Sequence, residues 1–354
     1  MEAGMYRKFL FIVFVMVLIL GAGGTIFAQR GSRSQETLEV KIASPVPRES
    51  PWGRTLDRIA AEWNRITNGQ VRLRVLHGGT EGDEEKMFLS LKSNTIQAAV
   101  FTSLGLSLID SAIMTINAPF SIRDTAELNA VMNVIQPELE ARLNSGDYFM
   151  LAWSKSGFVN FFTKDPVFTP DDLRKQKISS GPEAEEMNTA FKSMGFQIVE
   201  TGLNEVGQKV ATGAVTAVYL PPAGAAAYQV NNYLKNMLPI NAAPVVGGIV
   251  INQVTWRRIA SLDARYQQEL LRVTRQLGAE LDGSMQKIDS DSINAMTRTG
   301  LIINRPSAAQ EQLWHNEGER VIPTLLGITY DRELYRKIND VLTQFRNGQN
   351  VQRR

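Results

Sequence analysis

Residues 177–222 read KISSGPEAEEMNTAFKSMGFQIVETGLNEVGQKVATGAVTAVYLPP, a stretch that predicts two short βα units followed by a strand. Residues 177–179 are typical of a strand. Gly181 and Pro182 then introduce a helix with glutamates in its first turn, where negative charge suits the helix dipole. Gly195 ends that helix. This alternation of short strands and helices predicts an α/β fold.

The second half of the stretch repeats the same order. Residues 196–199 are typical of a short apolar strand, and Asn204 is a suitable N-cap for the helix that follows. Gly213 occupies the position at which a glycine commonly ends a helix. Residues 215–220 are then expected to form a strand.

That strand should stop at Pro221 and Pro222, because proline cannot donate a hydrogen bond to a neighbouring strand. In open α/β sheets, ligands bind beyond the carboxyl ends of the strands. Ser179 and Leu220 each occupy such an end. They are therefore candidate ligand contacts.

Together with residues 170–173, this stretch resembles the DctP-type solute-binding proteins of tripartite ATP-independent periplasmic (TRAP) transporters. The residues that match the family pattern are Pro170, Asp172, Leu173, Lys177, Ile178, Gly195, Glu205, Val206, Gly213, Val215 and Pro221. Other matching segments follow in the family's order, at residues 50–53, 78–79, 118–120 and Trp256. The resemblance extends over nearly the whole chain after its N-terminal segment.

The resemblance implies an α/β, two-lobed periplasmic-binding-protein-like fold with a hinge and a long helix crossing both lobes. Independently, residues 263–299 keep the apolar spacing of a helix. Such a helix would span roughly 50 Å at about 1.5 Å per residue. Gly247 and Gly248 are expected near the hinge, since glycine tolerates unusual backbone conformations. We expect lobe I to contain residues 37–155 and 248–280, lobe II to contain residues 156–247 and 281–346, and residues 347–354 to form a tail.

The N-terminus resembles a secretory signal. Arg7 and Lys8 precede the apolar residues 9–20, and a glycine-rich break leads to Ala28 as a suitable last residue of a signal peptide. We therefore expect residues 1–28 to form a signal peptide and the mature protein to reach the periplasm.

An uncleaved inner-membrane anchor is the alternative, because residues 9–28 carry no charge and could just span a bilayer. The glycines within residues 21–24 would weaken such a helix, so we favour cleavage. The polar residues 29–36 are interpreted as a flexible leader.

The composition excludes several classes of function. A net charge of +2, with scattered basic residues, gives no sign of nucleic-acid binding. The chain has no cysteine, so it can form no disulfide, thiolate nucleophile or cysteine metal site. His77 and His315 lie far apart, and the sequence contains no phosphate-binding glycine loop or serine-hydrolase motif. We expect no catalytic activity, no cofactor and no metal.

Two acidic groups could suggest a cation site. Asp289 and Asp291 superficially resemble a calcium loop, but they fall in a helical pattern and the glycine of that loop is missing, so a solvated helix face is expected. Four further acidic residues stand before and within the first turn of another predicted helix, where acidic residues are ordinary: Glu81, Asp83, Glu84 and Glu85. Neither group is interpreted as a binding site.

The predicted ligand cleft contains aromatic, small and apolar residues. Some stand at strand ends, and others occupy family positions near the crossing between the lobes. The candidate contacts are Trp52, Thr102, Ser103, Phe120, Trp153, Phe158, Val159, Ser179, Tyr219, Leu220 and Val246.

The resemblance also indicates which ligand-binding groups are missing. In the family, two arginines and a supporting asparagine hold a substrate carboxylate, and those positions fall on Val159, Ser179 and Leu220. A carboxylate buried without a cationic partner costs several kcal/mol. We therefore favour a hydrophobic or weakly polar ligand over a small organic acid held by a relocated arginine. A binding-fold protein that lost transport and became a sensor or interaction module is a further alternative.

The resemblance implies partners as well. The closed, ligand-bound form would deliver its ligand to TRAP-type membrane permease subunits. Some TRAP-associated systems use a helical-repeat periplasmic partner, which an apolar ligand would make more suitable here.

Overall fold

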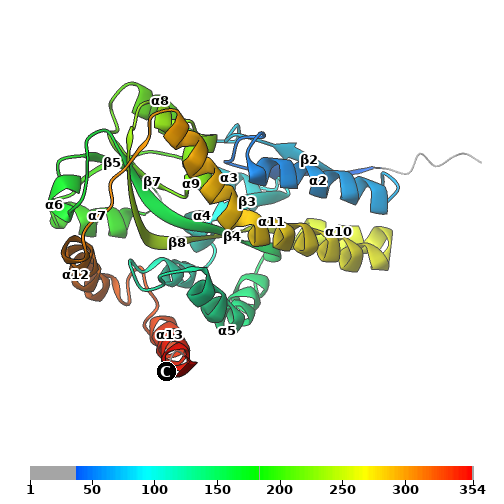
Figure 1. The fold of residues 1–354 in the computed structure, drawn as a ribbon. Helices are drawn as coiled ribbons and strands as arrows, with labels where there is room; N and C mark the ends of the chain where they lie inside the picture. The colour runs from blue at the N-terminus through cyan, green and yellow to red at the C-terminus, as the bar shows by residue number, and fades with distance from the viewer. Residues whose placement is uncertain (1–36, 183, 353–354) are drawn as a thin grey trace, which may run out of the picture. The chain divides into compact units, whose positions relative to one another are not determined.

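The computed structural model describes residues 37–182 and 184–352. These residues form one nine-stranded sheet and numerous helices (Figure 1). The α/β class predicted from the sequence is confirmed. The expected signal peptide (1–28) and leader (29–36) lie outside the described residues. Within the part of the chain that is described, no helix is both long enough and apolar enough to span a bilayer.

The sheet joins short parallel strands through two long ones. The strands are β1 (Leu38–Ala43), β2 (Val71–Leu76), β3 (Ala98–Thr102), β4 (Tyr148–Thr163), β5 (Lys177–Ser180), β6 (Gln197–Glu200), β7 (Ala217–Leu220), β8 (Asn236–Asn252) and β9 (Ile302–Ile303). Their spatial order is β2-β1-β3-β8-β4-β7-β5-β6, with β9 beside β8. β1 is parallel to β2 and β3, and β5 is parallel to β6 and β7. β8 is antiparallel to β3 and β4, and β4 is antiparallel to β7, so β8 and β4 together link the two parallel groups.

Helices surround the sheet. They are α2 (Pro51–Ile66), α3 (Glu84–Lys92), α4 (Ser103–Ser107), α5 (Thr125–Asn144), α6 (Pro170–Leu173), α7 (Glu185–Ser193), α8 (Val206–Ala211), α9 (Pro222–Ala227), α10 (Gln253–Leu262), α11 (Ala264–Arg298), α12 (Ala308–Leu325) and α13 (Arg332–Gln352), with 3-10 turns η1 (Ser111–Asn117) and η2 (Val230–Asn232). The predicted long helix is confirmed as α11, which runs for 35 residues. It packs against α2, β4 and α9 in turn (Figure 1).

Local sequence signals explain most helix starts. Asp83 accepts a hydrogen bond from the backbone N–H of Lys86 and caps α3. The predicted N-cap of α8 is wrong: Glu205 flanks that helix, and no side chain caps it. Asn204 instead lies close to Gly79, which belongs to the loop between β2 and α3. Asn204 therefore makes a tertiary contact with this loop and does not cap α8.

The two long strands have a hydrophobic core on each side. Met150 and Leu151 are neighbours in β4 but belong to different cores, and so do Val250 and Ile251 in β8. Side chains of a strand alternate between the two faces of a sheet, so helices must cover both faces. α5 and α13 contribute to one core, whereas α2, α10 and α11 contribute to the other.

The expected lobe boundaries fall at neighbouring points of these strands. Ser154 of β4 pairs with Gly247 of β8, and Trp153 pairs with Gly248. A Cβ atom on Gly247 would lie 2.4 Å from the carbonyl oxygen of Phe101, so a side chain there would collide with β3. Glycine is therefore required here by close strand packing. Neither Gly247 nor Gly248 has a positive φ, so unusual backbone angles do not explain these glycines.

Candidate functional site

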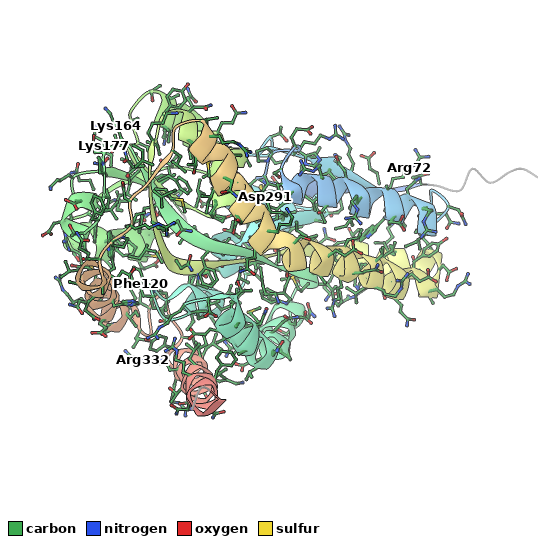
Figure 2. The ribbon with its side chains drawn as sticks, in the orientation of Figure 1. Arg72, Phe120, Lys164, Lys177, Asp291 and Arg332 are labelled. Atoms are coloured by element: carbon green, nitrogen blue, oxygen red, sulfur yellow. The ribbon has the colours of Figure 1, made fainter. Side chains whose placement is uncertain are left out.

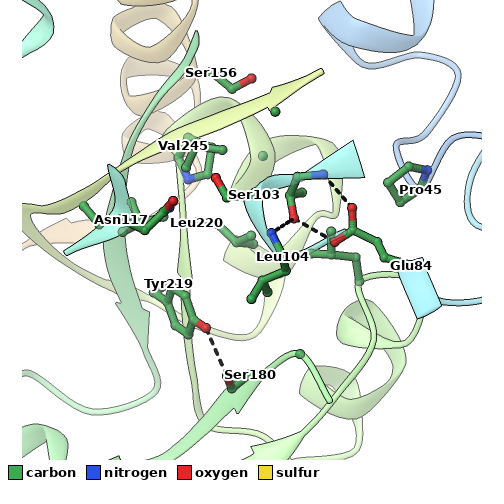
Figure 3. A pocket seen from close by; sticks show the side chains of 18 of the residues that line it. Pro45, Glu84, Ser103, Leu104, Asn117, Ser156, Ser180, Tyr219, Leu220 and Val245 are labelled. Atoms are coloured by element: carbon green, nitrogen blue, oxygen red, sulfur yellow. Dashed lines mark hydrogen bonds between the residues drawn. The ribbon is translucent and has the colours of Figure 1, made fainter. Parts of the chain in front are cut away.

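A cavity of about 350 Å³ lies beside the ends of three strands (Figure 3). Thr102, Ser180 and Leu220 are the last residues of β3, β5 and β7, and all three line it. This is the position at which open α/β sheets bind ligands. The cavity is therefore the candidate ligand site.

Nine of the eleven residues predicted from the sequence line this cavity. They are Trp52, Thr102, Ser103, Phe120, Trp153, Val159, Ser179, Tyr219 and Leu220. They come from both sides of the expected lobe boundary. The cavity therefore brings together segments that are distant in the sequence.

The other two predicted contacts, Phe158 and Val246, lie elsewhere. Both are buried in the core that α5 covers, at 6% and 0% exposure. Their neighbours Val159 and Val245 line the cavity instead. Adjacent residues of a strand point to opposite faces, so Phe158 and Val246 are removed from the candidate site.

The hydroxyl groups around the cavity bond mainly to other groups of the protein. Nε1 of Trp52 donates to Oγ of Ser156 at 2.9 Å, which joins α2 to β4. Oγ of Ser103 donates to the carbonyl oxygen of Val246 at 2.6 Å. The hydroxyls of Ser180 and Tyr219 are 3.1 Å apart (Figure 3). These bonds fix the positions of the polar groups.

Asn117 is a lining residue that the sequence did not predict. Its Nδ2 donates to the carbonyl oxygen of Pro244 at 3.0 Å. Its Oδ1 is buried without a hydrogen-bond partner among the described residues. A ligand hydroxyl or amide could donate to this atom. The residue ends the 3-10 turn η1, and no sequence motif marks it.

One end of the cavity is formed by apolar side chains of α7 and α12. Met187 and Phe191 are four residues apart on α7, and Trp314 and Val321 come from α12. The ring of Trp314 stacks on Phe161 of β4, with centroids 5.5 Å apart. The i, i+4 spacing on α7 predicts a buried face. It does not indicate that the buried face adjoins a cavity.

The lining residues include carboxylates but, within the described chain, no arginine, lysine or histidine. Oε1 of Glu317 forms ion pairs with Arg174 at 2.8 Å and with Arg320 at 3.1 Å. Glu317 lines the cavity, and the two arginines do not. Asp83 caps α3 and faces Lys86. A ligand carboxylate would therefore find no cationic lining group among these residues.

The sequence predicted that Asp289 and Asp291 lie on a solvated face of a helix. This is correct for Asp291 and wrong for Asp289. Asp291 is exposed and pairs with Lys287 (Figure 2). Asp289 is half-buried, and its Oδ1 accepts a hydrogen bond from the backbone N–H of Ala223 at 2.9 Å. Burial raises the pKa of Asp289 to about 6. Across the residues described, no group of three or more side chains could hold a metal ion.

Comparison with known proteins identifies the family. The family model described as bacterial extracellular solute-binding protein, family 7 (DctP), matches residues 42–326. No curated protein sequence matches the chain significantly.

Solved TRAP periplasmic solute-binding proteins share the fold. The structure from Ralstonia eutropha H16, with bound (S)-2-acetolactate, has a TM-score of 0.80 and 17% identity over 86% of this chain and 99% of the other. The structure from Shewanella oneidensis, with bound succinate, has a TM-score of 0.79 and 14% identity over 86% and 99%. The structure from Desulfovibrio salexigens, with bound orotic acid, has a TM-score of 0.78 and 15% identity over 87% and 99%. These matches confirm the two-lobed fold class.

The family match also confirms the resemblance found in the sequence, and with it the interpretation as a binding protein without enzymatic activity. Proteins of this family are periplasmic, and TRAP solute-binding proteins deliver small molecules to a membrane permease. The chain therefore belongs to family 7 of the bacterial extracellular solute-binding proteins, the DctP family.

Proposed function

We propose that this TRAP solute-binding protein captures a hydrophobic or weakly polar ligand, and not a typical carboxylate. Its class already implies a small-molecule ligand and a TRAP permease. The proposal adds the polarity of the ligand to what the family implies. The observation that carries it is the apolar lining of the cavity, which includes no cationic side chain in the described chain.

Energetic considerations support an apolar ligand. A ligand that buries about 250 Å² of apolar surface gains roughly 6 kcal/mol at about 25 cal/mol per Å². That gain must offset the ordering of the ligand and of mobile side chains. A buried carboxylate would instead lose its hydration without gaining an ion pair, at a cost of several kcal/mol.

The three absent family groups support the same proposal. Val159, Ser179 and Leu220 all line the cavity, where the family would place two arginines and an asparagine. An acid held by a relocated arginine is the rival, and the related structures contain bound acids. No arginine in the described part of the chain lines the cavity. This favours the apolar ligand for this chain.

A protein that had lost transport and become a sensor or interaction module would have less need of a cavity. Protein interiors are normally packed with few voids larger than a water molecule. The retained cavity of about 350 Å³ therefore favours ligand capture.

The proposal includes closure of two lobes around the ligand. Lobe I would contain residues 37–155 and 248–280, and lobe II residues 156–247 and 281–346. A ligand that contacts both lobes stabilises the closed form by its differential affinity for that form. The closed form would dock on the permease. An apolar ligand also needs protection from water during transfer, which makes a helical-repeat periplasmic partner suitable.

Isothermal titration calorimetry combined with small-angle X-ray scattering tests this function. The ligands would be succinate, D-glucuronate and neutral apolar molecules of similar size. We expect heat and compaction of the protein with the neutral molecules only. Micromolar or tighter binding of either acid, accompanied by compaction, would refute the proposed ligand class.

A further inference from the structure

The amide group of Asn117, a lining residue, is hydrogen-bonded on one side only. Its Nδ2 donates to the carbonyl oxygen of Pro244 at 3.0 Å. Pro244 offers only an acceptor there, so the NH2 group of the amide must face it. Oδ1 therefore lies on the other side of the amide, where it is buried without a hydrogen-bond partner among the described residues. In Figure 3 the Asn117 side chain points toward Val245 and Leu220, which also line the cavity.

The backbone acceptors beside Asn117 are already occupied. β3 ends at Thr102, and beyond this point three alternate carbonyl groups of β8 accept hydrogen bonds from groups outside the sheet. The pairs are Oγ of Ser103 with Val246 at 2.6 Å, Nδ2 of Asn117 with Pro244 at 3.0 Å, and the backbone N–H of Phe120 with Ala242 at 2.8 Å. The last two bonds hold residues 117–120 against β8. Oδ1 of Asn117 is therefore an acceptor with a defined position.

An amide oxygen without a partner is not by itself a binding site. Asn188 of α7 has the same arrangement, because its Nδ2 donates to the carbonyl oxygen of Gly181 at 3.0 Å and its Oδ1 is buried without a partner among the described residues. Asn188 is 1% exposed and does not line the cavity. Asn117 differs because it lines the cavity, so a ligand can supply the missing donor.

We propose that the ligand carries a neutral hydroxyl or amide donor and that Oδ1 of Asn117 accepts a hydrogen bond from it. This inference rests on the proposed function and names the polar group of a ligand that is otherwise apolar. The apolar part would lie against side chains of α7 and α12, including Met187, Phe191 and Val321. A pure hydrocarbon would leave the amide oxygen buried and unpaired, which costs free energy. A ligand donor removes this cost and keeps a hydrogen bond of its own on leaving water.

Two isomeric ligands isolate the contribution of the donor. Octan-1-ol and 1-methoxyheptane have the same composition and one oxygen each, but only the alcohol can donate a hydrogen bond. The net free energy of one neutral hydrogen bond corresponds to about tenfold in affinity. We therefore expect the wild type to bind the alcohol about tenfold more tightly than the ether.

The test measures displacement of the neutral dye N-phenyl-1-naphthylamine from the mature protein at neutral pH, and compares the dissociation constants of the two ligands. Asn117→Leu keeps the approximate size of the side chain and removes the acceptor, so the ratio of the two constants should fall to about one. Loss of the bond to Pro244 would weaken both ligands alike and leave the ratio unchanged. The ratio therefore separates a contact with the ligand from a purely structural role of Asn117.

Asn188→Leu is the matched control, since it makes the same change at an amide of the same arrangement outside the lining. It should leave the tenfold preference unchanged. If Asn117→Leu fails to fold, the wild-type ratio decides the question, because an alcohol that meets no acceptor should bind no more tightly than the ether. A ratio near one in the wild type, or an equal ratio in the wild type and Asn117→Leu, would overturn this inference and leave the proposed function intact. Failure of the dye and of both neutral ligands to bind would instead overturn the proposed function.

Discussion

The backbone N–H of Lys155 donates a 2.9 Å hydrogen bond to Oδ1 of Asp282. Lys155 lies next to a register shift in β4, and Asp282 is a half-buried residue of α11. Seven residues further along α11, Asp289 accepts from the N–H of Ala223 in α9. Two carboxylates thus attach the long helix to β4 and α9, next to the expected lobe boundary.

This attachment predicts an unusual dependence of stability on pH. Burial raises the pKa of both Asp282 and Asp289 to about 6, compared with about 3.9 for an unfolded aspartate. A raised pKa means that the folded state binds the proton more tightly. The resulting stabilisation is complete below about pH 4 and is lost as the pH rises through 6. Asp282→Asn should therefore increase the free energy of unfolding by about 1 kcal/mol at pH 7.5, after allowance for partial exposure, and change it little at pH 4.

Urea denaturation at the two pH values measures this difference. Asp291→Asn is the control, because Asp291 lies on the same helix but is exposed and pairs with Lys287. Its effect should stay below about 0.5 kcal/mol at both pH values. Equal effects of Asp282→Asn at pH 4 and pH 7.5 would show that the buried charge is not responsible.

Gly157 should tolerate no side chain. Its φ is +85°, and an added Cβ atom would lie 2.4 Å from Oδ2 of Asp289. Gly157→Ala should therefore reduce the free energy of unfolding by about 1–3 kcal/mol. Gly146→Ala serves as the control, since no atom lies within 4 Å of its Cβ position. Thermal denaturation would separate the two variants, and similar melting temperatures would refute this explanation of Gly157.

Leu220 should contribute directly to ligand affinity. It is 8% exposed, ends β7 and lines the cavity. Leu220→Asp would place an unpaired charge in an apolar part of the lining and should weaken binding of a neutral ligand at least about tenfold. Val254→Asp makes a similar change at a residue that is 71% exposed, and it should leave affinity unchanged. Dye titration of folded protein compares them, and unchanged affinity in Leu220→Asp would remove Leu220 from the site.

Elements with a regular spacing of apolar residues could be predicted from the sequence, whereas elements with an interrupted spacing could not. The expected helix at 263–299 agrees with α11 to within a residue at each end, because its apolar spacing continues without interruption and Asp263 caps it. Residues 149–153 have the apolar and aromatic composition typical of a strand, yet β4 continues to Thr163. Bulges between Met150 and Phe161 disturb the two-residue alternation on which strand prediction depends.

The site could be predicted in position but not in full composition. Strand ends and family positions located nine lining residues, whereas Phe158 and Val246 required knowledge of which way each side chain points. Glu84 was interpreted as an ordinary helix-start residue, because its burial against Thr102 depends on a contact 18 residues away. Orientation and burial are tertiary properties, and local spacing does not determine them.

Mass spectrometry of the material released from purified, denatured protein tests the central claim most directly. The protein would be isolated from its native host without refolding, so that a bound ligand is retained. We expect a hydrophobic or weakly polar molecule in stoichiometric amount. Recovery of a stoichiometric dicarboxylate or sugar acid would contradict the account.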